Sequence, residues 1–293
     1  MSLSLRSYNV AVRICHTISE MRAACRAARQ NQRRLGFVPT MGALHAAHIS
    51  LVRAARRQCD AVAVSIFVNP TQFGPKEDFS KYPRTFERDR ELLEAEGVDF
   101  LFAPSTEEMY PPGTTTFVTV EDLSEKLCGR SRPGHFRGVT TVVSKLLNIV
   151  EPDVAFFGQK DAAQAVIVRR MVRDLGLGVE IVVCPIVREP DGLALSSRNA
   201  YLDVKQRKQA TVLYRSLMRV QALADRGECD SARLVAAALE VFKEEPEVWL
   251  DYFEIVDRET LDPVANTSKG ALVAVAAFVG TARLIDNVVL PSQ

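Results

Sequence analysis

The sequence predicts an α/β protein with a doubly wound parallel sheet and a second, smaller α+β domain at its C-terminal end. Up to Pro185, apolar runs alternate with helical segments, an order typical of strand–helix–strand units in a parallel sheet. A polar segment at residues 186–202 then breaks this alternation. The last part of the chain contains further strand-like stretches that are joined by long connections.

The first helix is indicated by its N-terminal cap. Thr17 and Glu20 have the spacing of a capping box at the start of the alanine-rich stretch 17–32. The apolar stretch 36–40 is expected to be the next strand, and the amphipathic stretch 48–58 the helix that follows it. The first domain therefore begins with a helix, a strand and a second helix.

The same alternation continues to the end of the first domain. The run 61–68 is almost wholly apolar and ends at the Asn69-Pro70 turn, as expected of a buried parallel strand. Further strands are predicted at 98–104, 154–158 and 179–185, and further helices at 85–97, 138–150 and 163–176. Because ligands of such sheets bind at the carboxyl ends of the strands, site residues are sought there.

The change of pattern after Pro185 predicts a domain boundary, with domains at residues 1–184 and 185–293. Helices are expected near 204–226 and 231–244, and strands at 249–257, 271–280 and 281–290. Helices followed by a run of strands are typical of an α+β arrangement. No internal repeat or low-complexity tract is present.

The charge balance excludes partners that are recruited by a global field. The 293 residues include 37 Lys and Arg against 36 Asp and Glu, a net charge of +1. Arginines do cluster at residues 22–34 and 53–57, but on alanine-rich helical stretches without interleaved aromatics, which indicates solvated helix faces. We therefore expect no nucleic-acid or membrane partner, and any anionic ligand must be held by local groups.

The cysteine pattern and the N-terminus indicate a cytoplasmic protein. The six cysteines are scattered without a CxxC pair, which suits a reducing compartment. Residues 1–17 lack the continuous apolar region of a signal peptide. No segment approaches the run of about 18 apolar residues that a transmembrane helix requires.

Two histidines follow the strand at 36–40. If a helix begins near His45, then His45 and His48 share one face, and the helix N-terminus favours an anion such as phosphate. The stretch "HAAH" lacks the spacing and the glutamate of a helical zinc motif, which argues against a metal. From the spacing alone, two structural histidines remain as good an interpretation as a phosphate site.

Other polar groups follow three further strands or strand-like runs. Lys160 comes after the strand at 154–158, where it can act as a point charge on phosphate. The loop "LALSSRN" offers two hydroxyls and a guanidinium, although it can equally form a turn that caps the next helix. The buried run 61–68 is followed by the amide side chains of Asn69 and Gln72, beside Phe73, which can bind a hydroxyl or carboxylate through hydrogen bonds. The alternative is that Asn69 only forms the turn and Gln72 is incidental.

Taken together, six colinear motifs resemble the pantoate–β-alanine ligase family, a member of the HIGH-motif nucleotidyltransferase superfamily. The motifs are "PTMGALHxxH", "SIFVNPTQFG", "YPRT", "RPGHFRGVTTVVSKL", "FFGQKD" and "VREPDGLALSSRNAYL". They run through the first two-thirds of the chain, and the resemblance continues more loosely to "GTARLIDN". It implies a Rossmann-like first domain, a C-terminal lid domain and a homodimer.

The resemblance also implies a reaction in two steps. ATP and (R)-pantoate give pantoyl adenylate and pyrophosphate, and the amine of β-alanine then attacks the acyl carbon to give pantothenate and AMP. Such chemistry needs positioning and charge stabilisation rather than a protein nucleophile. Six residues are implied as catalytic, with His48 as the proton donor: His45, His48, Lys160, Ser196, Ser197 and Arg198.

The substrate contacts carry over position by position. The residues implied to contact ATP are Met41, Gly42, Ala43, Leu44, His45, Ala46, Ala47, His48, Gly158, Gln159, Lys160, Asp161, Val187, Leu195, Ser196, Ser197 and Arg198. Gln72 and Gln164 are implied to hold pantoate, and Gln72 also β-alanine. Mg²⁺ is implied to bridge the ATP phosphates, with Asp89 as a second contact.

The family also places His135 and Arg137 near the pantoate and β-alanine pocket. Val142, Val143 and Phe157 are implied as an apolar wall for the gem-dimethyl group of pantoate. For the valines, the ordinary core of a helix is an equally good interpretation.

Two positions depart from the family pattern. The family has a glycine where Ala47 precedes the second histidine, and glycine there lets the nucleotide approach the backbone. Ala163 stands where the family has a glutamine beside the one matched by Gln164. Two alternatives are therefore kept: a different nucleotidyltransferase that acts on a phosphate acceptor, and a weakened or non-catalytic nucleotide-binding protein.

Overall fold

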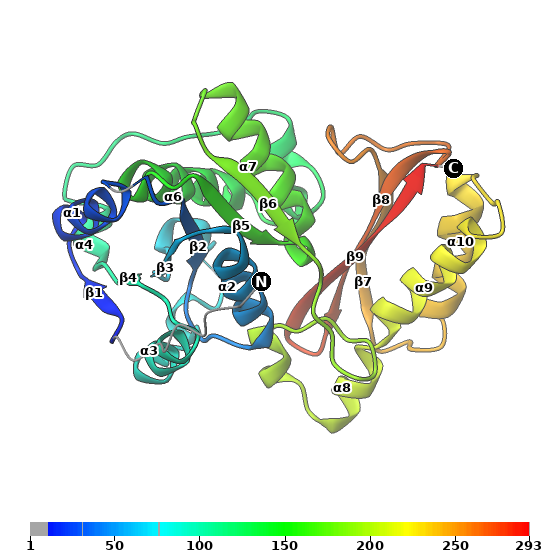
Figure 1. The fold of residues 1–293 in the computed structure, drawn as a ribbon. Helices are drawn as coiled ribbons and strands as arrows, with labels where there is room; N and C mark the ends of the chain where they lie inside the picture. Colours follow the sequence, from blue (N-terminus) through cyan, green and yellow to red (C-terminus); the bar gives the residue numbers. More distant parts are fainter. Residues whose placement is uncertain (1–10, 31, 76, 293) are drawn as a thin grey trace, which may run out of the picture.

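The first domain is a six-stranded, wholly parallel sheet with helices on both faces (Figure 1). The computed structural model describes residues 11–30, 32–75 and 77–292. The strands, in the spatial order β1-β4-β3-β2-β5-β6, are β1 (Arg13–Cys15), β4 (Phe100–Phe102), β3 (Ala61–Ile66), β2 (Leu35–Thr40), β5 (Val154–Gly158) and β6 (Glu180–Cys184). This confirms the predicted doubly wound parallel sheet.

The two faces of the sheet are covered by different helices because residues along each strand alternate between them. Phe37 of β2 packs with the helices α1 (Ile18–Arg29), α6 (His135–Val150) and α7 (Ala162–Asp174). The next residue, Val38, packs with α2 (Ala46–Gln58) and α3 (Phe86–Ala95) on the opposite face. Both faces are thus buried, which explains the near-continuous apolar strands.

The order of the strands fixes where a ligand can bind. From β2 the chain moves to β3 and β4 on one side, and later to β5 and β6 on the other. The direction of winding therefore reverses between β2 and β5, and the loops after these two strands separate to leave a crevice.

The second domain is an antiparallel three-stranded sheet with helices on one face. Its strands are β7 (Trp249–Val256), β8 (Lys269–Val279) and β9 (Ala282–Ser292), which confirms the three predicted strands. The helices α8 (Val204–Gln209), α9 (Val212–Ala224) and α10 (Ser231–Phe242) complete the domain. The other face of the sheet packs on the first domain, since Tyr252 and Ala274 join a core that includes Leu127.

Several predicted bounds differ from the structure. The helix expected over 204–226 is two helices, because the chain turns at Ala210 and Thr211 without the Gly or Pro that marks a break in a sequence. The short elements β1, α4 (Thr106–Met109) and α5 (Cys128–Ser131) were not predicted, because three or four residues are too few to show a period. The capping box at Thr17 and Glu20 is confirmed.

Two expectations concern a signal peptide at the N-terminus and a membrane-spanning helix. Residues 1–10, which contain most of the segment considered for a signal peptide, lie outside the described residues. Within the described ranges, no helix has both the length and the apolar character that a bilayer crossing demands.

Candidate active site

Most of the predicted site residues line one cavity of about 240 Å³ at the carboxyl ends of β2, β3, β5 and β6. This is the crevice where the winding of the sheet reverses. The predicted residues that line the cavity are Met41, His45, Ala47, His48, Gln72, Gly158, Lys160, Asp161, Gln164, Val187, Leu195, Ser196, Ser197 and Arg198. Residues far apart in the sequence thus meet because each follows a strand of one parallel sheet.

The two histidines lie at the N-terminus of α2, as the phosphate interpretation requires. His45 has extended backbone and precedes the first helical residue, and its ring centroid is 4.1 Å from that of His48. Nδ1 of His48 accepts the backbone N–H of His45 at 3.3 Å, so the ring proton of neutral His48 is on Nε2. Nδ1 of His45 is buried without a hydrogen-bond partner among the described residues. A buried nitrogen of this kind in a cavity wall is suited to a ligand.

Burial keeps both imidazoles neutral. Burial and the neighbouring His45 lower the pKa of His48 to about 3, while burial and the charge of Lys160 lower the pKa of His45 to about 4. At neutral pH both rings therefore present N–H donors without a positive charge. The cationic groups of the site must come from other residues.

The loop that precedes the histidines is held by Asp89. Its oxygens accept the backbone N–H groups of Ala43 and Leu44, both at 2.8 Å, and the hydroxyl of Thr85 at 3.1 Å. The loop needs this support because Gly42 and Ala43 have φ angles of +82° and +51°. Asp89 is 1% exposed and is not among the residues that line the cavity. The geometry therefore gives Asp89 the role of holding the loop, and does not support the expected magnesium contact.

Gln72 is fixed by its neighbours. Asn69 donates to Oε1 of Gln72 at 3.0 Å and to the carbonyl of Gly138 at 3.1 Å, and it accepts the hydroxyl of Tyr110 at 2.8 Å. A Cβ at residue 138 would lie 2.3 Å from the carbonyl oxygen of Thr71, so only glycine lets α6 approach this turn. Asn69 thus forms the turn and also orients the amide of Gln72, so the turn interpretation is confirmed, and binding of a hydroxyl or carboxylate by Gln72 stays a prediction.

A charged group lies beside Gln72 that the sequence did not single out. Arg132 forms two hydrogen bonds with the carboxylate of Glu77, at 2.8 and 2.6 Å, and donates to Nε2 of His135 at 2.9 Å. His135 in turn donates from Nδ1 to the carbonyl of Gln72 at 2.9 Å. Burial and the charge of Arg132 lower the pKa of His135 to about 4. His135 and Arg132 line the cavity, whereas the expectation for Arg137 is wrong, because its guanidinium is exposed and stacks 3.6 Å from the ring of Phe117.

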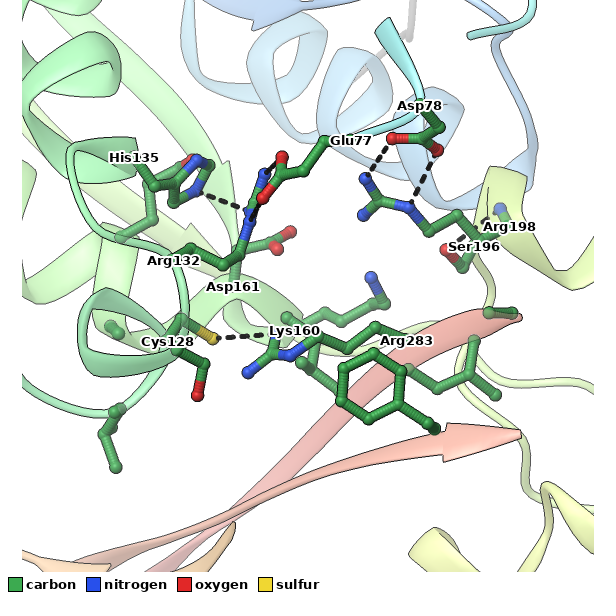
Figure 2. Close-up of a pocket in the computed structure, with 18 of the residues that line it drawn as sticks. Glu77, Asp78, Cys128, Arg132, His135, Lys160, Asp161, Ser196, Arg198 and Arg283 are labelled. Carbon is green, nitrogen blue, oxygen red and sulfur yellow. Dashed lines mark hydrogen bonds and ion pairs between the residues drawn. The ribbon is translucent and has the colours of Figure 1, made fainter. Parts of the chain in front are cut away.

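Lys160 and Arg198 both line the cavity, from distant parts of the chain. Lys160 follows β5, and no hydrogen bond or ion pair of its side chain is found among the described residues. Arg198, from the second domain, pairs with Asp78 through contacts of 3.2 and 3.3 Å. Figure 2 shows Lys160, Arg198 and Arg132 around one space. Ser196 also accepts the backbone N–H of Arg198 at 3.3 Å, which confirms the turn interpretation of this loop; its contact with phosphate stays a prediction.

The cavity opens into a larger one, of about 820 Å³, between the two domains. Of the residues that the structure describes, seven line both spaces: Arg132, His135, Lys160, Asp161, Gln164, Ser196 and Arg198. Val142, Val143 and Phe157 are at most 5% exposed, and they belong to the core while also lining the smaller cavity. Both interpretations of the valines are thus compatible with the structure.

Some residues of the ATP set lie outside the smaller cavity. Leu44 is buried in the core, Ala46 is exposed, and the side chain of Gln159 bonds to Asn287 instead. Gly42 and Ala43 are also absent from its lining. Across the described ranges, no three His, Cys, Asp or Glu side chains gather as a metal-binding group.

The arrangement has the properties of a site for a polyanion and a carboxylic acid. Lys160 and Arg198 supply positive charge, and the neutral histidines and the N-terminus of α2 supply N–H donors. Gln72 and Gln164 supply amides beside an apolar wall. No side chain pair has the geometry of an activated nucleophile and its base among the described residues of the cavity, so the site suits chemistry between two bound substrates.

Comparisons with known proteins agree with this description. The family profile for pantoate-beta-alanine ligase matches residues 13–289. A pantothenate synthetase of Koribacter versatilis is 63% identical over 279 residues, which cover 95% of this chain and 96% of the relative. The crystal structure of a pantothenate synthetase from Thermus thermophilus has a TM-score of 0.90 at 50% identity, covering 94% of this chain and 99% of that one.

A further crystal structure was solved with ligands. It is a pantoate-beta-alanine ligase from Francisella tularensis complexed with beta-gamma ATP and beta-alanine. It is 35% identical to this chain with a TM-score of 0.79, and covers 95% of this chain and 97% of its own.

Proposed function

The chain belongs to the pantoate-beta-alanine ligase family, and from this premise we propose that its cleft joins pantoate to β-alanine through a pantoyl adenylate. ATP is the second substrate of the first step, in line with the ATP and beta-alanine named for the Francisella relative. The observation that supports the proposal is the meeting of cationic, imidazole and amide side chains in one cavity at the sheet's switch point.

In the first step, a carboxylate oxygen of pantoate attacks the α-phosphorus of ATP, and the bond to the pyrophosphate oxygen breaks. Lys160 and Arg198 neutralise the charge that grows on the phosphate oxygens, assisted by the hydroxyls of Ser196 and Ser197. Gln72 and Gln164 orient pantoate, whose gem-dimethyl group faces Val142 and Val143.

The two histidines assist through hydrogen bonds. Because the pKa of His48 is lowered to about 3, the ring is neutral and donates its Nε2–H to a phosphate oxygen. The negative charge of bound phosphates favours protonation of both imidazoles, which increases their capacity as donors. We therefore assign His48 the role of a hydrogen-bond donor to phosphate. This is the form in which it fills the proton-donor role that the family resemblance implies.

In the second step, the neutral amine of β-alanine attacks the acyl carbon of the adenylate. An amide bond forms, AMP leaves with the electron pair of the broken ester bond, and the amine releases a proton. The site binds this amino acid beside Gln72, the residue that also contacts the acyl group. No covalent bond to the protein is required.

Magnesium is proposed to enter as MgATP rather than to occupy a site of its own. Mg²⁺ is commonly held by substrate phosphates together with one or two carboxylates. Both oxygens of Asp89 are engaged by backbone N–H groups, whereas Asp161 lines the cavity. Of these two carboxylates, only Asp161 has the position to face bound MgATP.

Three further features complete the proposal. Residues 185–293 act as a lid, since Arg198 reaches the cavity from that part of the chain. The buried thiols of Cys15, Cys25, Cys128 and Cys184 suit the cytoplasm. A homodimer is inferred from the resemblance to the family.

The test is an AMP-release assay in which each substrate is omitted in turn. We expect AMP only when pantoate is present, and full turnover only with β-alanine. His48→Ala should reduce pantoate-dependent ATP–pyrophosphate exchange by about 100-fold, the typical effect of losing one preorganised donor. His16→Ala is the matched control, because His16 is exposed and bonds to the carbonyl of Ala103.

Three outcomes would contradict the proposal. AMP formation that is unaffected by omitting pantoate excludes an acyl adenylate. A stable dinucleotide-like product points to the other class of nucleotidyltransferase, although the paired amides of Gln72 and Gln164 argue against a phosphate acceptor. ATP binding without turnover would identify a non-catalytic relative.

A further inference from the structure

We propose that Asn287, on β9 of the second domain, is a positioning residue that sets the backbone of Lys160 for the phosphates of ATP. Asn287 lies in the segment "TARLIDN", to which the reaction described above assigns no task. The inference rests on the proposed function, because Lys160 is taken as a phosphate ligand.

The contacts between Asn287 and the loop after β5 are specific. Its Nδ2 group donates to two consecutive carbonyl oxygens, those of Gln159 at 2.9 Å and Lys160 at 3.0 Å. Its Oδ1 accepts Nε2 of Gln159 at 2.9 Å. Asn287 is 3% exposed, so these bonds are shielded from water. One amide side chain therefore engages the loop at three points.

These bonds hold the backbone at Lys160, whereas the Lys160 side chain makes no bond, among the described residues, that would hold its own position. Lysine has a flexible four-carbon chain, and no hydrogen bond or ion pair of the Lys160 ammonium is found in the described part of the chain. Two consecutive peptide carbonyls held by one amide restrict the backbone dihedral angles around Lys160, and hence the direction in which its side chain leaves the loop.

The strand that carries Asn287 is itself anchored to a second loop of the site. Asp286 is 3% exposed and forms two hydrogen bonds with Arg188, at 2.6 and 2.9 Å. Arg188 follows Val187, which lines the cavity, and its guanidinium lies 4.7 Å from the ring of Tyr214. Strand β9 thus connects the loops after β5 and β6, which both contribute to the ATP site.

An alternative role for Asn287 is simply to dock one domain on the other. The chain offers a control, because Lys126 makes a separate contact between the domains. Its ammonium lies 2.7 Å from Asp262 and 3.0 Å from the carbonyl of Thr260. Neither Lys126 nor its partners line the two cavities of the site, so Lys126→Ala weakens docking without touching the loop of Lys160.

The experiment is a double-mutant cycle on the full-length chain. Asn287→Ala, Lys160→Ala and the double variant are compared in ATP–pyrophosphate exchange and in ATP binding by calorimetry. Asn287→Asp is the second variant, since it keeps the shape and the acceptor for Gln159 but loses both N–H donors. Thermal melting establishes that each variant is folded.

We expect each Asn287 variant to raise the KM and Kd for ATP by roughly 10-fold or more, the scale on which a small misplacement acts. The aminolysis of preformed pantoyl adenylate should change by less than about 3-fold, because the β- and γ-phosphates have already left. With Lys160→Ala already present, the loss of Asn287 should add less than about 2-fold.

Three results would overturn the inference: effects of the two substitutions that multiply, a KM for ATP within about 2-fold of the parent, or an equal effect of Lys126→Ala. Failure of the proposed function is seen separately, as a parent chain that forms no AMP with pantoate. In that case the calorimetric cycle for ATP still decides whether Asn287 acts through Lys160.

Discussion

Arg198 is paired with Asp78 in the structure, so the proposed function requires that this carboxylate be exchanged for a phosphate when ATP binds. Nε and an Nη of Arg198 lie 3.3 and 3.2 Å from the two carboxylate oxygens, and Asp78 belongs to the segment just before the short helix at Phe79–Lys81. Asp78→Asn keeps the shape of the side chain and removes its charge. We predict that this substitution tightens ATP binding.

The magnitude follows from the geometry of the pair. Two unit charges at this separation interact by about 5 kcal/mol at an effective dielectric constant of about 20, before desolvation is subtracted. The side chains are 30% and 23% exposed, so solvent screening and desolvation reduce the net interaction free energy of the pair. We take about 1 kcal/mol, the upper end of the range for solvent-exposed ion pairs. A change of this size corresponds to roughly a five-fold lower KM for ATP.

The assay measures KM and Kd for ATP at low and high salt. The gain should shrink at about 0.5 M salt, because screening already weakens the pair in the parent chain. Asp191→Asn is the control, since Asp191 pairs with Arg207 at 2.6 Å in the second domain and lines neither cavity. A KM for ATP that is unchanged or raised by Asp78→Asn would refute the reasoning.

Three further predictions concern residues of the first domain. Ala47→Gly should lower the KM for ATP, because it removes a methyl group from the cavity wall. Because residue 47 lies in the first turn of α2, the glycine should also lower the unfolding free energy by about 0.5–1 kcal/mol. A raised KM would contradict this prediction. Histidine NMR should show His45, His48 and His135 neutral down to about pH 5, because their folded pKa values of about 4, 3 and 4 lie below the unfolded value of about 6.5. The unfolded chain then binds more protons, so denaturation midpoints should fall as pH decreases from about 6.5 toward 4, and a midpoint that is constant over this window would be inconsistent with these values. Asp89→Asn should lower the unfolding free energy by about 1–3 kcal/mol and raise the KM for ATP, with the magnesium dependence unchanged; a shifted magnesium requirement would restore Asp89 as a metal contact.

Much of the fold was predictable because its elements are long and strongly patterned. The capping box at Thr17 and the apolar runs of β3 and β5 determine local structure through residues that are close in sequence. Short elements such as β1 and the turn between α8 and α9 carry too little local pattern, and they form because the neighbouring sheet or core supplies their partners.

The site was predictable where a polar residue lies in the connection that follows a strand. His45, His48, Gln72, Lys160 and the loop at 195–198 meet as expected, because strand ends in a parallel sheet share one edge. Arg132, Asp78 and Asn287 were not singled out, since an arginine beside a proline, an aspartate in a charged loop and an asparagine in a strand are each common in sequences. Their roles depend on partners that are many residues away.

The sequence by itself determined the order of the long strands and helices, the smaller C-terminal domain and the chemical types in the connections after the strands. Those properties depend on apolar periodicity, caps and turn residues, which act over a few residues. Only the tertiary structure decided that Asp89 holds a loop, that Arg137 faces away, and that Asn287 reaches the backbone of Lys160. These assignments depend on where distant segments meet, and burial then determines which polar groups must pair with one another.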